Sequence, residues 1–166
     1  MTQQPGVKPA RGAGSADRVR AALDACGLAD AIVTFEQSTK TAQMAADAMG
    51  CELGQIVKSI VFVADGSPVV ALVAGDRRGD TDAIAAEFGA RKVRMAEAET
   101  VREATGYAIG GVSPFDLPEE LPVLVDDSLG RFEVLYPAAG TPQSMVRMDR
   151  EMLMTLVRGR VARISS

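Results

Sequence analysis

The chain has 166 residues and a formal net charge of −4, with 18 Lys and Arg against 22 Asp and Glu, and it contains no histidine. Without imidazole the chain has no Ser/His/Asp triad, no Cys/His pair and no histidine-ligated zinc or haem. Hydrolytic chemistry would therefore rest on carboxylates, lysine, hydroxyl groups, main-chain dipoles or the substrate itself.

The composition predicts one globular domain behind a short leader. Hydrophobic residues make up 47% of the chain and aromatic residues 4%, so we expect a core of aliphatic side chains. Residues 1–14 are rich in glycine and proline, and we expect a flexible leader there, with the domain over 15–166. Cys26 and Cys51 are expected to be reduced thiols of a cytoplasmic protein. No apolar run approaches the roughly 20 residues of a membrane span, so no membrane partner is expected.

Apolar spacing and turn residues predict a succession of helices and strands. In chain order, the expected elements are a helix capped by Ser15 and ending at Gly27, a strand over 31–35, a helix that begins after Ser38/Thr39 and ends at Gly50, strands over 56–64 and 69–74, a helix capped by Asp80 and ending at Phe88, a strand over 92–95, a helix over 97–105, strands over 121–125, 132–136 and 145–148, a helix capped by Asp149 and ending at Arg158, and a strand over 161–164.

The strongest hairpin signal joins the runs 56–64 and 69–74 through Asp65-Gly66-Ser67-Pro68. Because the first run alternates little, we expect this hairpin in the middle of a sheet, buried on both faces. A second hairpin-like connection is expected through residues 126–130. Since helices and strands mix without a regular βαβ rhythm, the predicted class is α+β, a single domain with a mixed, largely antiparallel sheet and flanking helices.

Lys58 lies just inside the start of a strand that is otherwise built for the interior. Its amine either reaches solvent at the edge of the sheet or forms a fixed cation that binds a phosphate or a carboxylate. The sequence leaves both readings open.

Gly110-Gly111-Val112-Ser113-Pro114 is a loop in which consecutive glycines let a ligand approach the main chain. Such a loop can direct backbone N–H groups at negative charge that develops on a carbonyl oxygen. It can equally be a plain tight turn. Ser113 is a poor nucleophile candidate, because no histidine is present to activate it.

Two further loops contain polar candidates. Asp126-Asp127-Ser128 follows a predicted strand and is suited either to an Asx turn or to acid/base or magnesium chemistry. Gly140-Thr141-Pro142 either lines a pocket or merely connects two strands. Five arginines near the C-terminus are typical of a solvated face and would also suit a nucleic-acid backbone, namely Arg147, Arg150, Arg158, Arg160 and Arg163.

Taken in order, Lys58, the Gly110 loop, the Asp126 turn and the Gly140 loop resemble the YbaK/prolyl-tRNA synthetase-associated editing-domain family over about residues 15–164. The resemblance implies a curved mixed sheet and hydrolysis of the ester that joins a wrong amino acid to tRNA. It implies a free-standing form that acts in trans on the 3′ end of mischarged tRNA, with prolyl-tRNA synthetase as a second partner. The resemblance implies no metal or other cofactor. It does not indicate an oligomeric state.

The same resemblance assigns roles by position. Lys58 would hold the terminal adenosine end of the tRNA, and Gly110, Gly111 and Ser113, followed by Pro114, would position the aminoacyl carbonyl and the attacking water. Asp126, Ser128, Gly140 and Thr141 match pocket positions. Where related free-standing members have histidines, this chain has Phe115-Asp116-Leu117 and Gln143, so the resemblance does not assign the amino acid removed.

Two alternatives belong to other classes. One is a domain of the same fold that binds tRNA or a synthetase without catalysis. The other is a small-molecule esterase that uses the pair Asp126/Asp127, for which metal dependence or turnover of simple esters would be diagnostic.

Overall fold

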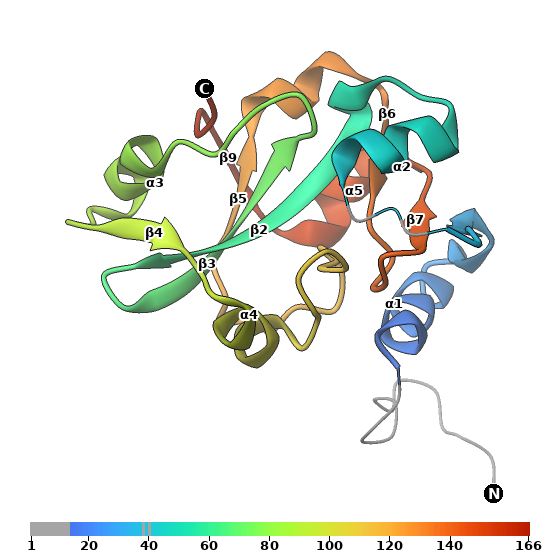
Figure 1. Cartoon of the computed structure of the whole chain (residues 1–166), viewed down its shortest axis with the longest axis horizontal. Helices are drawn as coiled ribbons and strands as arrows, with labels where there is room; N and C mark the ends of the chain where they lie inside the picture. Colours follow the sequence, from blue (N-terminus) through green and yellow to red (C-terminus); the bar gives the residue numbers. More distant parts are fainter. Residues whose placement is uncertain (1–13, 38, 40) are drawn as a thin grey trace, which may run out of the picture.

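A computed structural model describes residues 14–37, 39 and 41–166 of the chain (Figure 1). The predicted leader, apart from Gly14, lies outside these residues, as does Ser38, one of the two residues after which the second helix is expected to begin. The elements are α1 (Ser15–Asp24), β1 (Ile32–Thr34), α2 (Ala42–Met49), β2 (Ile56–Ala64), β3 (Ser67–Ala74), α3 (Thr81–Phe88), β4 (Val93–Met95), α4 (Ala98–Thr105), β5 (Val123–Asp126), β6 (Val134–Pro137), β7 (Ser144–Val146), β8 (Met148–Asp149), α5 (Arg150–Val157) and β9 (Arg160–Ala162), with short 3-10 helices at η1 (Ala29–Ala31), η2 (Leu53–Gln55) and η3 (Asp127–Arg131).

The predicted hairpin forms the centre of a curved mixed sheet with strand order β8-β6-β2-β3-β5-β9. Strand β2 pairs antiparallel with β3 and with β4, and parallel with β6. Strand β3 pairs parallel with β5, and β5 pairs parallel with β9 at the edge. The α+β class and the mixed sheet are therefore confirmed.

The predicted hairpin-like connection through residues 126–130 is wrong. Strand β5 joins the outer edge of β3 and β6 joins the outer edge of β2, so the central hairpin separates them. The intervening residues form η3, which carries the chain across the end of this hairpin. The hairpin of β2 and β3 offers two open edges, so β5 and β6 can each pair with one of its strands.

The outer edge of β2 is paired only near its ends. Strand β6 pairs with Ile56 and Val57, and β4 pairs with Phe62 to Ala64. Among the described residues, no strand covers this edge over 58–61, a stretch that we call the β2 window. At one residue of this stretch, Val61, a loop takes the place of a strand, because the Ala96 amide donates to the Val61 carbonyl at 2.9 Å. The main-chain groups of Ser59 face the same edge, since successive residues of a strand alternate in direction.

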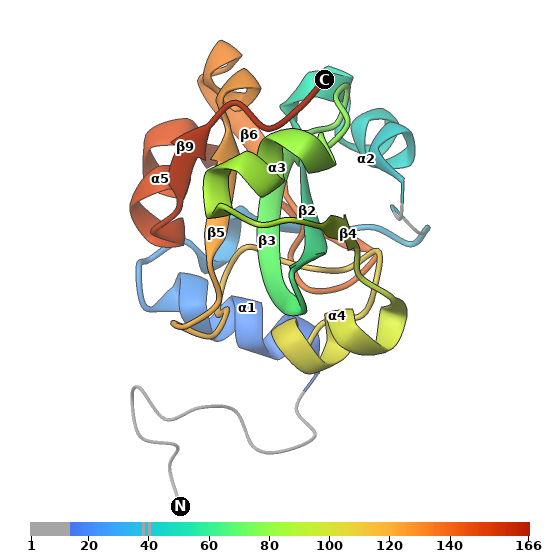
Figure 2. The same ribbon diagram turned by 90° about the vertical axis from the view of Figure 1, so that its left-hand side faces the viewer.

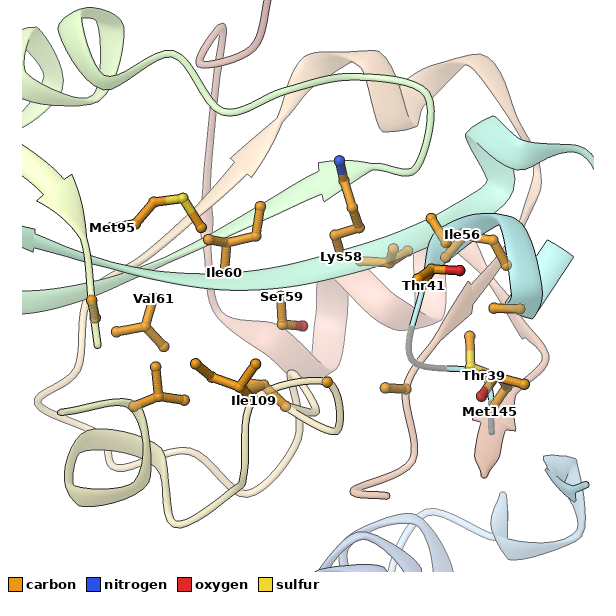
Figure 3. Close-up of a pocket in the computed structure, with 18 residues that line it drawn as sticks. Thr39, Thr41, Ile56, Lys58, Ser59, Ile60, Val61, Met95, Ile109 and Met145 are labelled. Carbon is orange, nitrogen blue, oxygen red and sulfur yellow. The ribbon is translucent and has the colours of Figure 1, made fainter. Parts of the chain in front are cut away.

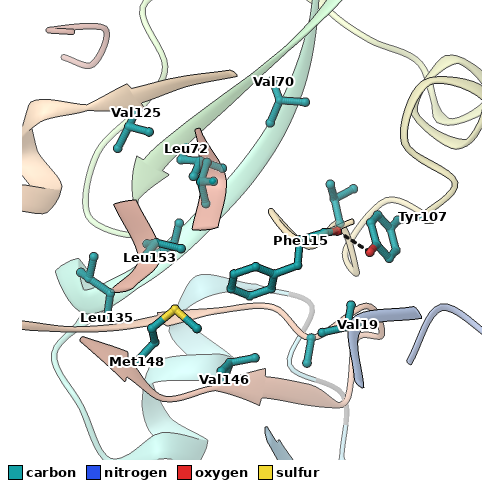
Figure 4. Close-up of a cluster of buried hydrophobic side chains, with 14 of the residues drawn as sticks. Val19, Val70, Leu72, Tyr107, Phe115, Val125, Leu135, Val146, Met148 and Leu153 are labelled. Carbon is teal, nitrogen blue, oxygen red and sulfur yellow. Dashed lines mark hydrogen bonds between the residues drawn. The ribbon is translucent and has the colours of Figure 1, made fainter. Parts of the chain in front are cut away.

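Helices cover both faces of the central strands (Figure 2). Ile84 of α3 packs with Phe62 and Val73 on one face. On the other face, the main core joins α1, α5 and the chain after α4 to the sheet (Figure 4). A third cluster packs Ala45 and Ala46 of α2 near the start of β2. The hairpin is thus buried on both faces, as its apolar sequence predicts.

The local capping signals agree with most of the helix boundaries. Asp80 caps α3 as predicted, accepting from the amides of Asp82 and Ala83. Thr41 caps α2 through a hydrogen bond from the Met44 amide at 3.1 Å. Ser15 is the first residue of α1 rather than its cap, which is Gly14. None of the described helices combines the length and the apolar character that a transmembrane segment requires.

Candidate active site

A cavity of about 240 Å³ lies beside the β2 window. Its walls come from β2, the Gly110 loop, the junction of β4 and α4, the start of α2, and the ends of β6 and β7 (Figure 3). Of the predicted site residues, Lys58 and Gly110 line this cavity. Two sequence features that are 52 residues apart, at positions 58 and 110, therefore meet at one place.

Strand alternation gives the cavity two sides. Lys58 and Ile60 project to one side of β2, whereas Ser59 and Val61 project to the other, toward Ile109 (Figure 3). The first side leads to the loop over residues 75–79, and the second side is the apolar floor beneath the strand. A ligand in the window could contact the lysine and the floor together.

The Lys58 side chain is half-buried, and its Nζ donates a hydrogen bond to the Arg77 carbonyl oxygen. Burial lowers the pKa of the Lys58 amine, and the positive charge of Arg78 lowers it further, while Asp76 acts in the opposite direction. Asp76 is itself bound by Arg131 at 2.7 and 2.9 Å. Lys58 is therefore a positioned cation that keeps donor hydrogens free for an anion, because an ammonium group has three.

The glycine loop uses its glycines for conformation and for close packing. Gly110 has φ of +89°, a left-handed conformation that favours glycine. A Cβ at Gly111 would lie 3.1 Å from the Thr141 Cα and 3.3 Å from the Gly140 carbonyl oxygen. The loop therefore lies directly against the second predicted loop, which brings Gly111, Gly140 and Thr141 together beside the cavity.

Ser113 and Pro114 are buried, and the structure does not place them in the cavity lining. The Ser113 Oγ accepts a hydrogen bond from the Phe115 amide at 3.3 Å. Tyr107 donates its hydroxyl to the Phe115 carbonyl at 2.6 Å, as Figure 4 shows. Burial raises the pKa of the Tyr107 hydroxyl, so it remains a donor. These contacts brace the loop from within.

Asp126 and Ser128 are also absent from the cavity lining. The Asp126 carboxylate accepts from the Ser128 amide and hydroxyl, the Ile164 amide and the Ser165 hydroxyl. It therefore forms an Asx turn and fixes the C-terminal segment, which is the structural alternative that the sequence left open. Thr141 also bonds locally, with its hydroxyl 2.8 Å from the Ser144 Oγ.

Sequence reasoning missed several lining residues, among which Ser59 is chemically the most informative. Its Oγ is buried and has no hydrogen-bond partner among the described residues. An unpaired buried hydroxyl is costly and rare, and one that lines a cavity is suited to a ligand. The sequence feature that could have indicated Ser59 is its position next to Lys58 in the same strand. The others include Thr39, Thr41, Met95, Ile109 and Met145.

The lining chemistry restricts what the cavity can do. Among the described residues that line it, Lys58 is the one with an ionisable side chain, and the other polar side chains are hydroxyls. No group of three metal-ligating side chains occurs in the part of the chain that the structure describes. The fold and site thus define a small α+β domain that can bind an anion beside an apolar pocket and supply main-chain donors to a reacting carbonyl.

Comparisons with known proteins identify the family. The family model described as "Aminoacyl-tRNA editing domain" matches residues 36–156. YwhH of Bacillus subtilis is 38% identical over 123 residues, which are 74% of this chain and 78% of YwhH. EbsC of Enterococcus faecalis, provisionally named a Cys-tRNA(Pro)/Cys-tRNA(Cys) deacylase, is 28% identical over 127 residues, 76% of this chain and 77% of EbsC.

A solved structure extends the match to nearly the whole fold. A crystal structure described as that of a candidate trans-editing enzyme for prolyl-tRNA synthetase superposes with a TM-score of 0.84 at 38% identity, covering 93% of this chain and 98% of that one. The chain belongs to the aminoacyl-tRNA editing domain family. Membership of this family places the chain among the aminoacyl-tRNA deacylases.

Proposed function

We propose that the protein is a trans-acting deacylase that hydrolyses the ester of mischarged tRNA(Pro) carrying alanine, cysteine or another small amino acid. The observation that carries this proposal is the meeting of Lys58 and Gly110 on one apolar cavity. Family membership and the similarity to EbsC and to the trans-editing structure support the same reaction. The proposed partners are the tRNA 3′ end and prolyl-tRNA synthetase, which places the activity in the cytoplasm.

In this proposal, the tRNA end lies across the β2 window. The ammonium group of Lys58 binds a phosphate of the terminal nucleotide, a contact strengthened by the charge on both partners. The aminoacyl group enters the apolar side, where Val61, Val101 and Val112 form the walls. A cavity of about 240 Å³ that also admits part of the ribose favours short side chains over long ones.

Hydrolysis begins with attack of water on the ester carbonyl carbon. The carbonyl oxygen becomes an oxyanion, and main-chain N–H groups of the glycine loop stabilise it. The amides of Gly110 and Val112 are candidates, because both residues line the cavity and neither amide has a partner among the described residues. The bond to the ribose oxygen then breaks, and that oxygen takes a proton, leaving free amino acid and tRNA.

Proton transfer in this scheme uses the substrate. A neighbouring ribose hydroxyl, or the thiol of a cysteinyl substrate, takes the proton from water and returns one to the leaving oxygen. The ribose hydroxyl is no stronger a base than the hydroxyls of Ser59 and the two threonines, but it adjoins the leaving oxygen and can pass its own proton to that oxygen as it receives one from water, while Lys58 bound to phosphate stays charged. An aminoacyl ester is already activated, so orientation and oxyanion stabilisation supply much of the required acceleration.

The test is ester loss from alanyl-tRNA(Pro), cysteinyl-tRNA(Pro) and prolyl-tRNA(Pro), measured with and without the protein. We expect acceleration with a small mischarged amino acid and none with the cognate proline. No acceleration with any of the three substrates would refute the proposal. Binding of uncharged tRNA(Pro) without deacylation would instead support the non-catalytic alternative, and turnover of simple esters would support the esterase.

A further inference from the structure

We infer that Arg18 of α1 is a positioning residue for the glycine loop, and that α1 therefore contributes to the activity of the site. This inference rests on the proposed function. The family model matches residues 36–156 and so begins after this helix. The case for Arg18 comes from its contacts with both ends of the loop segment 107–115.

The Arg18 guanidinium ties together the two ends of that segment. At one end, Nη2 donates to the Thr105 carbonyl oxygen at 3.2 Å. At the other end, Nη2 donates to the Asp116 carbonyl oxygen at 2.8 Å and Nε donates to its carboxylate at 2.9 Å. The rigid fork of arginine can make such bonds together, whereas the single ammonium of lysine cannot reproduce this geometry.

The loop is shaped to receive this side chain. The guanidinium lies over the Tyr107 ring at 4.4 Å from its centroid. A Cβ at Gly106 would collide with the guanidinium, so the glycine provides the space that it occupies. Asp116 has φ of +55°, a left-handed conformation that is uncommon for residues other than glycine, although aspartate adopts it more readily than most. The bonds from Arg18 to its carbonyl and carboxylate stabilise that conformation.

Helix α1 also holds the neighbouring loop. A Cβ at Gly140 would lie 2.6 Å from the Ser15 carbonyl oxygen and 2.9 Å from the Val19 Cγ2. Gly140 in turn lies against Gly111, as described above. One helix thus contacts both loops at the cavity, the first through Arg18 and the second through its own main chain.

This arrangement predicts a specific catalytic defect. Oxyanion stabilisation depends on donors held within a fraction of an ångström, and a misplacement of about 1 Å can cost about 100-fold in rate. Loss of the Arg18 contacts would free the segment 107–115, which contains Gly110, without touching Lys58. We therefore expect a fall in kcat with little change in KM.

The experiment compares Arg18→Met and Arg18→Lys with a control, Arg20→Met, which alters an exposed arginine of the same helix. We expect kcat for the mischarged tRNA to fall by about 10- to 100-fold in Arg18→Met, with a smaller fall in Arg18→Lys and none in the control. Amide hydrogen exchange should be faster over 107–115 in Arg18→Met while the sheet strands exchange as in the parent protein.

Each outcome decides the inference. Unchanged kcat, or reduced kcat with unchanged exchange over 107–115, would overturn it. If Arg18→Met does not fold, Asp116→Ala removes the carboxylate that accepts from Arg18 Nε and is judged by the same two measurements. If the parent protein deacylates none of the substrates, the proposed function fails, and the exchange measurement alone then shows whether Arg18 holds the loop.

Discussion

Lys58 differs from an ordinary surface lysine in that its amine is half-buried and already oriented. Its Nζ is bound to the Arg77 carbonyl, and the nearby Arg78 adds positive charge. Part of the entropy cost of ordering a long side chain is therefore met before a ligand arrives. Such a group binds an anion more firmly than a freely moving lysine does.

We predict that Lys58→Ala lowers kcat/KM by about 10- to 100-fold, the effect of losing one charge-assisted contact of about 1.5–3 kcal/mol. Lys92→Ala, at an exposed lysine outside the cavity lining, is the matched control. Because the pKa of Lys58 is lowered, the cation loses its proton at a lower pH than an ordinary lysine. Affinity of the parent protein for tRNA should thus decline on the alkaline side, and Lys58→Ala should lack that decline. Equal kcat/KM in folded Lys58→Ala and Lys92→Ala would contradict the role.

We predict that replacing Ser59 has opposite effects on stability and on activity. Its buried Oγ, which has no hydrogen-bond partner in the part of the chain that the structure describes, costs free energy in the protein without substrate. We expect Ser59→Ala to raise the free energy of unfolding by about 1 kcal/mol and to lower kcat/KM by about 2- to 10-fold, the value of one hydrogen bond to the substrate. Denaturant unfolding and deacylation measure the two, with the exposed Ser67→Ala as control. A variant that is destabilised, or that retains full activity, would disprove this role.

At the scale of elements, Asp126 connects β5, η3 and the C-terminal segment. Burial alone would raise the pKa of this carboxyl, but hydrogen bonds from Ser128, Ser165 and the Ile164 amide outweigh burial and keep the pKa below its usual range. A carboxylate with a lowered pKa in the folded state contributes stability above its unfolded pKa, about 4, and loses it as the pH falls through the folded value.

We therefore predict that Asp126→Asn lowers the free energy of unfolding by about 2–3 kcal/mol at pH 7. Its stability should also fall less steeply than that of the parent protein between about pH 4 and lower values. Urea unfolding at several pH values measures both effects, and the exposed neighbour Asp127→Asn serves as control. The same acid dependence in Asp126→Asn and the parent protein would show that another group dominates.

The elements that the sequence predicts well are those set by local patterns. The bounds of β2 agree with the apolar run 56–64, and those of α3 agree with the helix predicted from the Asp80 cap to Phe88. Pairing between distant strands is not a local property, so the separation of β5 from β6 and the β2 window were not predictable. Lys58 and Gly110 could be proposed from residue type, whereas the contacts of Arg18 with Thr105 and Asp116 depend on the folded arrangement of α1.

At the scale of the whole molecule, the net charge of −4 leaves little general attraction for RNA. Two of the five C-terminal arginines bond to other groups of the protein, whereas Arg147 and Arg163 are exposed. Arg150 donates to the carbonyls of Gly130 and Phe132, and Arg160 lies 3.3 Å from the Glu87 carboxylate. Arg158 lies 3.9 Å from Glu119, but both side chains are exposed, so this ion pair holds the arginine only weakly. Arg77 and Arg78 are exposed and lie near Lys58, so we expect positive charge to be available to tRNA beside the cavity.

We predict a shallow salt dependence of tRNA binding. Each neutralised phosphate of single-stranded nucleic acid contributes about −0.7 to the slope of log K against log[salt]. Contact with two or three phosphates would give a slope of about −2, measured by fluorescence titration with labelled tRNA. The double variant Arg77→Ala/Arg78→Ala should reduce the slope, whereas Arg160→Ala should not. A much steeper slope would indicate an extended RNA-binding surface.

The β2 window also bears on how such an enzyme can acquire a new substrate. The main-chain groups that face the window and the glycine loop are present whatever side chain a residue carries. Substitutions at Ser59, Val101, Val112 or Met145 would reshape the cavity and leave those groups in place. If the proposed mechanism holds, main-chain atoms and Lys58 carry the reactivity and the other lining side chains carry the selectivity, so selectivity can be altered one side chain at a time without rebuilding the chemistry.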